Sequence, residues 1–178
     1  KLVGLRPHNL GTIMTKYYDM ENIPDQKWFL TDKSEELLEG LNHGLAEVVR
    51  RAVAISDIEI QVIDGKRNTR QQNEYFRKGV TQSASSPHMY GYAVDLIALV
   101  EGRICLEQEV YDDVANCMRF AGQDLYTPIR WGGAWHCDNI CAYTGLIDDL
   151  QFHYIDWCVQ QQIRPRLDVN HFELSVAE

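Results

Sequence analysis

The stretch that decides the fold is SPHMYGYAVD, residues 86–95. It places His88 and Asp95 seven residues apart, with Asp95 at the start of the apolar run 96–100, so that a loop entering a strand would hold a nitrogen and an oxygen donor. Near the C-terminus, DVNHFEL at 168–174 offers a second histidine, His171, with a carboxylate three residues before it. Such donors suit zinc, and three protein ligands with one open position are typical of hydrolytic zinc sites.

Further motifs accompany these two segments. They are LEGL at 38–41, GKRNT at 65–69 followed by Gln71 and Gln72, and RWGGAW at 130–135. Together with the two segments, and in the same chain order, they resemble the zinc peptidases of the D-Ala-D-Ala carboxypeptidase and phage L-alanyl-D-glutamate endopeptidase group, most closely its endolysin branch. The resemblance implies an α+β fold of the hedgehog and D,D-peptidase type. In this fold a small, mainly antiparallel sheet bears a zinc site and helices pack on one face.

The resemblance also implies roles for single residues. His88, Asp95 and His171 are expected to bind one Zn²⁺ per chain. Asp168 is expected to act as general base, and Arg67 to face the substrate carbonyl or its oxyanion, because a guanidinium offers a fixed and permanently charged fork. Simpler interpretations stay open, with Asp168 as a turn carboxylate and Arg67 as a surface salt-bridge partner.

Four more residues are expected to line or support this site. Ser86 is expected to bond the substrate, while Trp131 and Trp135, set around a Gly-Gly pair, are expected to form a cleft wall. Glu173 lies two residues from His171, hence on the same side of a strand, and is expected to orient that ligand. The two tryptophans can equally be core residues.

Composition indicates one ordinary globular domain spanning residues 1–178, and we expect a monomer. The chain is 45% hydrophobic and 24% charged, without an apolar run near the ~20 residues of a membrane helix, so no membrane insertion is expected. The net charge of -9 argues against nucleic acid, because no basic stripe exists to displace counterions from a phosphate backbone.

The cysteines do not form a disulfide framework, since they are five in number and irregularly spaced. We expect reduced thiols. A second, structural zinc site is conceivable at His136, Cys137 and Cys141, with His153 further on. Partly buried free cysteines in a helical segment are the favoured interpretation, because Cys-x3-Cys without a second paired motif is a poor zinc signature.

Hydrophobic periodicity predicts the order of the elements. A short segment, 1–30, precedes them. The sequence then predicts a short helix from residue 32, a second helix after residue 42, a strand at 58–63, a helix at 69–78, a strand from 93, a helix at 109–122 and a helical insertion at 136–166.

The resemblance implies hydrolysis of peptide-stem bonds in bacterial peptidoglycan, most closely the L-alanyl-D-glutamate bond, by a phage endolysin. An alternative with the same chemistry is a D,D- or L,D-carboxypeptidase that trims the stem, which needs a pocket for a free carboxylate near the zinc. An alternative of another class is a non-catalytic zinc-containing binding module. Because no signal sequence is visible, the protein is expected to be made in the host cytoplasm and to act on the wall after release.

Overall fold

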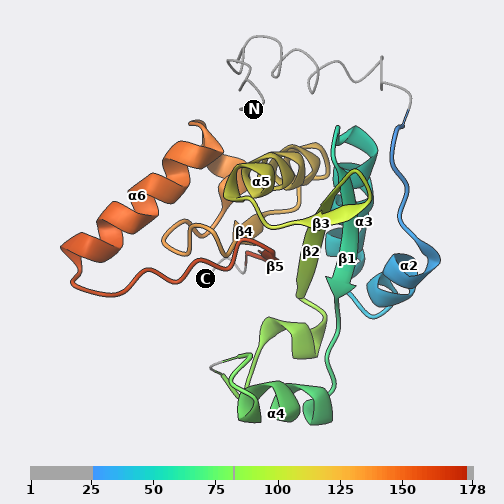
Figure 1. Cartoon of the computed structure of the whole chain (residues 1–178), viewed down its shortest axis with the longest axis horizontal. Helices are drawn as coiled ribbons and strands as arrows, with labels where there is room; N and C mark the ends of the chain where they lie inside the picture. The colour runs from blue at the N-terminus through green and yellow to red at the C-terminus, as the bar shows by residue number, and fades with distance from the viewer. Residues whose placement is uncertain (1–25, 82, 176–178) are drawn as a thin grey trace.

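The computed structural model describes residues 26–81 and 83–175. Most of the expected N-terminal segment, 1–30, therefore lies outside the described residues. In chain order the elements, drawn in Figure 1, are α2 (Asp32–Leu38), α3 (His43–Ile55), β1 (Glu59–Asp64), α4 (Thr69–Arg77), η1 (Pro87–Tyr90), β2 (Ala93–Val100), β3 (Arg103–Cys105), α5 (Gln108–Asp124), β4 (Ile129–Trp131), η2 (Ile140–Ala142), α6 (Ile147–Gln160) and β5 (His171–Leu174).

The strands form one five-stranded antiparallel sheet, as predicted. Its order is β1-β2-β5-β4, and β3 pairs with the far end of β2. The C-terminal strand β5 is thus inserted beside β2, with His171 directly opposite Asp95 and Glu173 opposite Ala93. Because residues that face each other across a ladder point to the same side, His171 and Asp95 share one face of the sheet.

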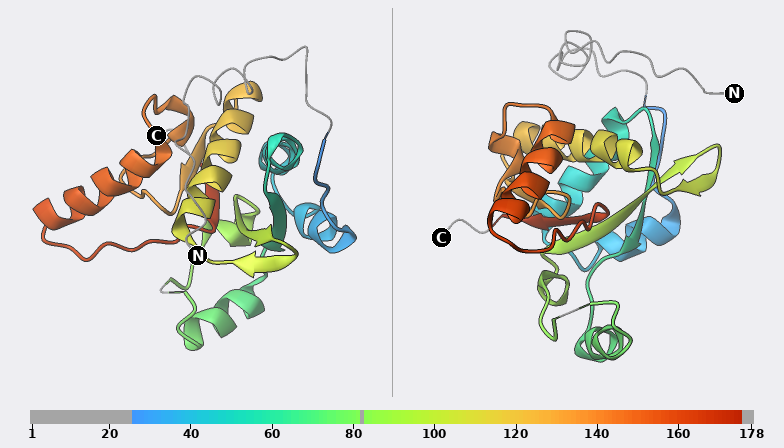
Figure 2. Two further views of the ribbon diagram at one scale, coloured as in Figure 1. Left: turned by 45° about the horizontal axis from the view of Figure 1, so that its top comes forward. Right: turned by 60° about the vertical axis from the view of Figure 1, so that its left-hand side comes forward.

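Helices α3 and α5 pack side by side on the other face of the sheet (Figure 2). Their apolar residues recur at helical spacing and meet the strand residues that alternate with the site residues, such as Val94, Leu96 and Phe172, all of them fully buried. Full burial of a Val, Leu or Phe side chain stabilises a fold by roughly 1.5–3 kcal/mol. This core therefore fixes the register on which the opposite face depends.

Helices α2, α4 and α6 lie outside this layer. Helix α2 lies along β1, where the Ser34 hydroxyl accepts a hydrogen bond from the Val62 backbone N–H at 3.0 Å and so covers the edge of the sheet. Helix α6 falls within the segment 136–166 that was predicted to be a helical insertion, and it packs against α5. Helix α4 and η1 lie together at the end of the sheet where β1 stops and β2 starts (Figure 1).

Candidate metal centre

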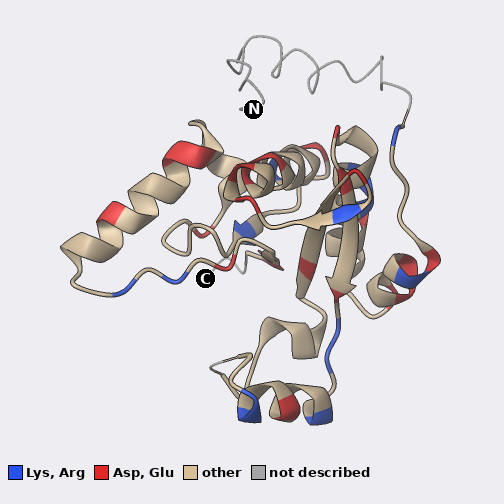
Figure 3. Ribbon diagram, in the orientation of Figure 1, with Lys and Arg blue, Asp and Glu red and all other residues tan. Residues whose placement is uncertain are grey.

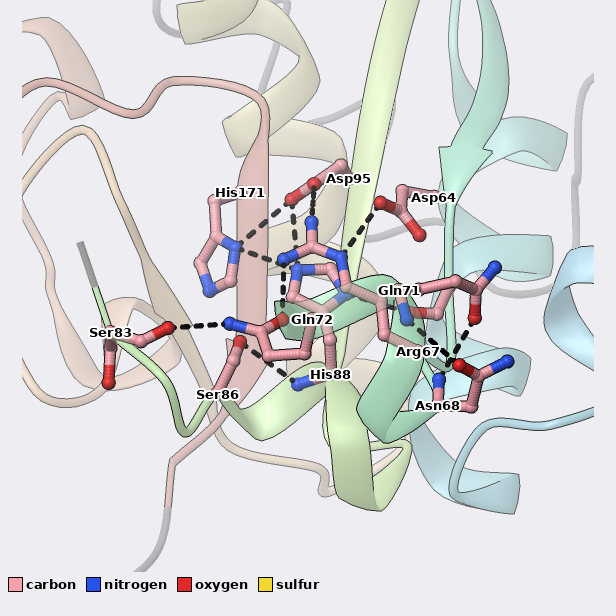
Figure 4. Close-up of polar contacts among 11 residues, drawn as sticks. Asp64, Arg67, Asn68, Gln71, Gln72, Ser83, Ser86, His88, Asp95 and His171 are labelled. Carbon is pink, nitrogen blue, oxygen red and sulfur yellow. Dashed lines mark hydrogen bonds and ion pairs between the residues drawn. The ribbon is translucent and has the colours of Figure 1, made fainter. Parts of the chain in front are cut away.

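Three side chains from three segments converge at this end of the sheet. His88 comes from η1, Asp95 from β2 and His171 from β5, and within the described ranges they are the one group of three histidine, cysteine or acidic residues whose donor atoms come together. His88 Nε2 lies 3.2 Å from His171 Nδ1 and 3.3 Å from Asp95 Oδ1, and His171 Nδ1 lies 3.0 Å from Asp95 Oδ1. The three donors thus form a nearly equilateral triangle (Figure 4).

The outer nitrogen of each imidazole is committed to an acceptor. His88 Nδ1 lies 2.7 Å from the Gly65 carbonyl, and His171 Nε2 lies 3.1 Å from Glu173 Oε2. Since a carbonyl or carboxylate oxygen can only accept, these outer nitrogens carry the protons, and the lone pairs of His88 Nε2 and His171 Nδ1 face each other. Glu173 therefore stands where it was predicted, against the ring of His171.

Gly65 is needed for the carbonyl that holds His88. A Cβ at this position would lie 2.3 Å from the Leu37 carbonyl oxygen at the end of α2, so no larger residue fits without movement of the backbone. The turn after β1 thus brings the backbone against both α2 and the His88 ring.

The third donor, Asp95, is held through its second oxygen by Arg67. Arg67 Nη2 donates to Asp95 Oδ2 at 2.9 Å, while its Nε donates to Asp64 Oδ2 at 2.8 Å. The guanidinium also lies over the Tyr75 ring and has a longer contact, 3.4 Å, with Gln72 Oε1. Only 8% of Arg67 is exposed, so the interpretation of this residue as a surface salt-bridge partner is wrong.

These contacts favour positive charge between the three side chains. Burial opposes ionisation of His171, but hydrogen bonds with Asp95 and Glu173 outweigh it and raise the pKa of His171 to about 9. Burial likewise acts to raise the pKa of Asp95, yet hydrogen bonds with His171 and His88 prevail and hold that pKa well below its usual range. The group therefore favours a bound cation, either a proton or a metal ion.

The triangle has the dimensions of a zinc site. Tetrahedral zinc with ligand bonds of 2.0–2.1 Å places neighbouring ligand atoms about 3.3–3.4 Å apart. The three separations of 3.0 to 3.3 Å are close to this value. Two imidazole nitrogens and one carboxylate oxygen are also donors that zinc accepts. The residues present therefore fit the predicted metal.

Asp168 is fixed to this group through its backbone. The turn before β5 is closed by a hydrogen bond from His171 N to Asp168 O, and Gly132 N donates to His171 O at 2.9 Å while Asp168 N donates to Gly132 O at 3.0 Å. The Trp-Gly-Gly segment thus clamps the turn that carries both Asp168 and His171.

The carboxylate of Asp168 has no hydrogen bond or ion pair within the residues that the structure describes. This disagrees with its interpretation as a turn carboxylate that binds backbone amides. Although the residue is exposed, the protein packed around the carboxyl raises the pKa of Asp168, and the negative charge of Asp95 adds to the rise. An unengaged carboxylate with a raised pKa is suited to accept a proton.

The two tryptophans occupy different environments. Trp131 is fully buried, stacks on Phe172 and donates its indole N–H to the Val169 carbonyl, so its predicted contact with substrate is wrong and its place is in the core. The three residues of β4 are too few for alternation to show which side each faces. Trp135 is partly exposed and its ring lies 5.4 Å from that of His171, so it does stand beside the site.

Ser86 has a local structural role. Its hydroxyl caps η1 by accepting from the His88 backbone N–H at 3.4 Å, so it helps to set the direction in which His88 leaves the loop. A contact with substrate remains a prediction for this half-buried side chain.

Several supporting groups were missed by the sequence analysis. They are Asp64, the Gly65 carbonyl, the fully buried Gln72 and Arg130, whose Nη1 lies 3.5 Å from Glu173 Oε1. Gln72 also donates to the Ser83 carbonyl at 2.8 Å and so ties α4 to the loop that leads to His88. The only sequence signal for these groups is their nearness to Arg67 and to the Trp-Gly-Gly segment.

Comparisons with known proteins agree with this site. The family described as phage L-alanyl-D-glutamate peptidase matches residues 27–157. The L-alanyl-D-glutamate peptidase of Escherichia phage T5 is 26% identical over 110 residues, which are 60% of this chain and 80% of that protein. The crystal structure of the Serratia marcescens L-Ala D-Glu endopeptidase ChiX superposes with a TM-score of 0.61 at 27% identity, over 84% of this chain and 91% of that one.

The family match contains two of the three metal-binding candidates. His88 and Asp95 lie within it, whereas Asp168 and His171 lie beyond residue 157. The pairing of β5 with β2 brings His171 to Asp95, across the segment that contains α6.

Proposed function

The chain belongs to the phage L-alanyl-D-glutamate peptidase family and is a peptidase; from this premise we propose that it cleaves the L-alanyl-D-glutamate bond of peptidoglycan stems with one zinc ion. The observation that carries the proposal is the triangle formed by His88 Nε2, Asp95 Oδ1 and His171 Nδ1, with separations of 3.0 to 3.3 Å. The relatives from phage T5 and Serratia marcescens are both named as peptidases of this bond, which supports this choice of substrate.

The proposed zinc ligands are His88, Asp95 and His171. Zinc bound there would supply Lewis acidity, which polarises the scissile carbonyl and lowers the pKa of water at the open position. Asp168 takes a proton from the attacking water and returns it to the leaving nitrogen, because its carboxylate is free of other partners and its pKa is raised.

Arg67 combines two tasks in this proposal. Three of its five N–H groups are engaged by Asp64, Gln72 and Asp95, one each from Nε, Nη1 and Nη2. One N–H on Nη1 and one on Nη2 are left to donate to the oxyanion that develops during attack. Arg67 thus fixes the orientation of Asp95 while it stabilises negative charge on the substrate.

The two alternative functions have less support. Both named relatives are endopeptidases or peptidases of the L-alanyl-D-glutamate bond rather than carboxypeptidases. A non-catalytic binding module would have no need of a carboxylate such as Asp168, held beside the metal ligands and free of partners.

The test is mass spectrometry of purified peptidoglycan after digestion. The zinc-loaded protein is compared with a chelator-treated sample and with the same sample after zinc is restored. Free peptides that begin at D-glutamate, lost on chelation and recovered with zinc, are the expected products. Loss of only the terminal stem residue would instead identify a carboxypeptidase. An absence of products from several wall chemotypes, with one zinc bound per chain, would favour a binding module.

We further propose that the protein acts on the wall as an endolysin, after release from the cytoplasm of an infected host. Among residues 26–81 and 83–175, no helix is long and apolar enough to cross a membrane. Sequencing of the N-terminus of the protein made in infected cells tests this route, because a cleaved signal peptide would contradict it.

A further inference from the structure

A hollow of about 440 Å³ opens where the loop after β1 enters α4. Lys66, Arg67 and Asn68 from the loop and Thr69 and Gln71 from α4 form its polar wall. Two of these five polar side chains are cationic, so a negatively charged group can be received here.

The hollow adjoins the metal centre through Arg67 and Met89, although none of the three metal-binding candidates lines it. Arg67 is one of its walls and donates to the metal-binding candidate Asp95 at 2.9 Å. Met89, another wall residue, directly follows His88 in η1, and the Arg67 backbone N–H donates to the His88 carbonyl at 3.0 Å. A substrate with its scissile bond at the metal centre can therefore place its next group in the hollow.

Of the two cations that line the hollow, Lys66 is the one without a carboxylate partner among the described residues. Arg67 is paired with Asp64 and Asp95, whereas Lys66 has no ion pair or hydrogen bond with any residue that the structure describes. Its stem packs along Gly40, where an added Cβ would lie 2.9 Å from Lys66 Cβ, and this contact keeps the side chain at the wall.

The segment around Lys66 is positively charged, although the chain as a whole is negatively charged. Residues 66–78 contain five basic residues and one acidic residue, a local charge of +4 in a chain of net charge -9. Figure 3 shows these basic residues in the loop after β1 and at both ends of α4. An anionic ligand is thus attracted to this end of the molecule and repelled by most of the rest.

We infer that this hollow binds the α-carboxylate of the D-glutamate residue on the leaving side of the scissile bond, with Lys66 as its counter-ion. The inference rests on the proposed function. In an L-alanyl-D-glutamate bond the leaving nitrogen is attached to the α-carbon of D-glutamate, and the same carbon bears the α-carboxylate. The chain continues through the γ-carboxyl, so the α-carboxylate is free unless it is amidated. Lys66 directly precedes Arg67, which contacts Asp95, and so lies on the segment that reaches the metal centre.

This geometry relates the endopeptidase to the carboxypeptidases that it resembles. A terminal D-alanine also carries a carboxylate on the carbon attached to the leaving nitrogen. The same pocket therefore suits both leaving groups, and the choice of bond depends on the room available for the rest of the stem.

The test uses two stem peptides attached to N-acetylmuramic acid, one with D-glutamate and one with D-isoglutamine, in which the α-carboxylate is an amide. Zinc-loaded wild type, Lys66→Met and the control Arg70→Met, a basic residue of α4 that does not line the hollow, are compared on both. A hydrogen bond to a charged group contributes enough for wild type to prefer the acid about tenfold or more in kcat/KM. Lys66→Met is expected to abolish this preference by slowing cleavage of the acid, and Arg70→Met to retain it.

A binding measurement separates failure of this inference from failure of the proposed function. The affinities of the product peptides that begin with D-glutamate or D-isoglutamine are measured by calorimetry for the same three proteins. Tighter binding of the acid that depends on Lys66 supports the pocket even if no bond is cleaved. Equal cleavage and equal binding of acid and amide by wild type, or a preference that survives Lys66→Met, overturns it.

Discussion

The chain contains two groupings of metal-binding residue types, and only one of them forms a site. His88, Asp95 and His171 come from separate segments, yet their donor atoms lie 3.0 to 3.3 Å apart. His136 and Cys137 are neighbours in sequence, and Cys141 is close to them, but they are not part of any such group within the described residues. Nearness in sequence therefore does not make a metal site here.

The difference lies in what surrounds each donor. In the first grouping the Gly65 carbonyl, Glu173 and Arg67 turn the outer atoms of the ligands away, so that the inner atoms converge. A metal site depends on such partners as much as on its ligands.

In the second grouping His136 and Cys141 contact neighbouring residues rather than each other. The ring of His136 stacks on Tyr154 at 5.5 Å, and Cys141 Sγ lies 3.6 Å from the Thr127 carbonyl. Burial raises the pKa of both Cys137 and Cys141, which opposes the thiolate form that binds zinc. These residues act as packing, in agreement with the favoured sequence interpretation.

The largest effect is expected from His171→Ala. The substitution leaves two ligands, so the protein should lose its zinc, and kcat/KM should fall about 10⁴-fold or more, because a catalytic metal supplies several kcal/mol of transition-state stabilisation. Zinc content by mass spectrometry of metals and cleavage of stem peptides measure the two effects.

His136→Ala is the matched control for this histidine. It removes an imidazole from the second grouping and should leave zinc content unchanged and kcat/KM within about twofold of wild type, because its ring packs on Tyr154 and Trp157 rather than on the metal-binding candidates. A loss of zinc from His136→Ala, or its retention in His171→Ala, would reverse the assignment of the two groupings.

Asp168→Ala is expected to separate catalysis from metal binding. Because Asp168 is not one of the converging donors, the variant should keep one zinc per chain while kcat/KM falls about 10²–10⁴-fold, the usual contribution of a general base. Stopped assays on stem peptides and zinc analysis of the same sample give both values. Asp156, an exposed carboxylate on α6, provides the control, and Asp156→Ala should match wild type. An active Asp168→Ala would show that Asp168 is not the general base.

The converging donors were predictable, but their supports were not. The order of the motifs identified His88, Asp95 and His171, and the apolar run 96–100 placed Asp95 at the start of a strand. The Gly65 carbonyl, by contrast, is a backbone group, and no pattern of side chains shows that it will meet a ring 23 residues away.

Part of the sheet was also predictable, because β1 and β2 have clear periods, whereas the short strands β3 and β4 were not predicted. The error concerned Trp131, where a three-residue strand has no period to read. Such short segments need the register of their neighbours, here Phe172 of β5, before their buried side is known.

Glu173→Gln is expected to have a smaller effect, on metal affinity. Glu173 lies 3.1 Å from His171 Nε2 and fixes the orientation of the ring, and loss of such an outer carboxylate typically weakens metal binding about 10–100-fold. Competition with a chromophoric chelator measures the zinc dissociation constant. Glu101→Gln, in the exposed turn between β2 and β3, is the control. An unchanged dissociation constant in Glu173→Gln would mean that packing alone orients His171.

The smallest effect is expected from the double substitution Cys137→Ser and Cys141→Ser. If the second grouping is only packing, wild type binds one zinc per chain and the variant still binds one, with kcat/KM within about twofold of wild type. The free energy of unfolding should fall by about 1–2 kcal/mol, because two half-buried thiols become hydroxyls with a greater need for hydrogen bonds. Zinc titration of both proteins decides the matter, since a second equivalent bound by wild type and lost in the variant would show that thiols with raised pKa values still bind metal.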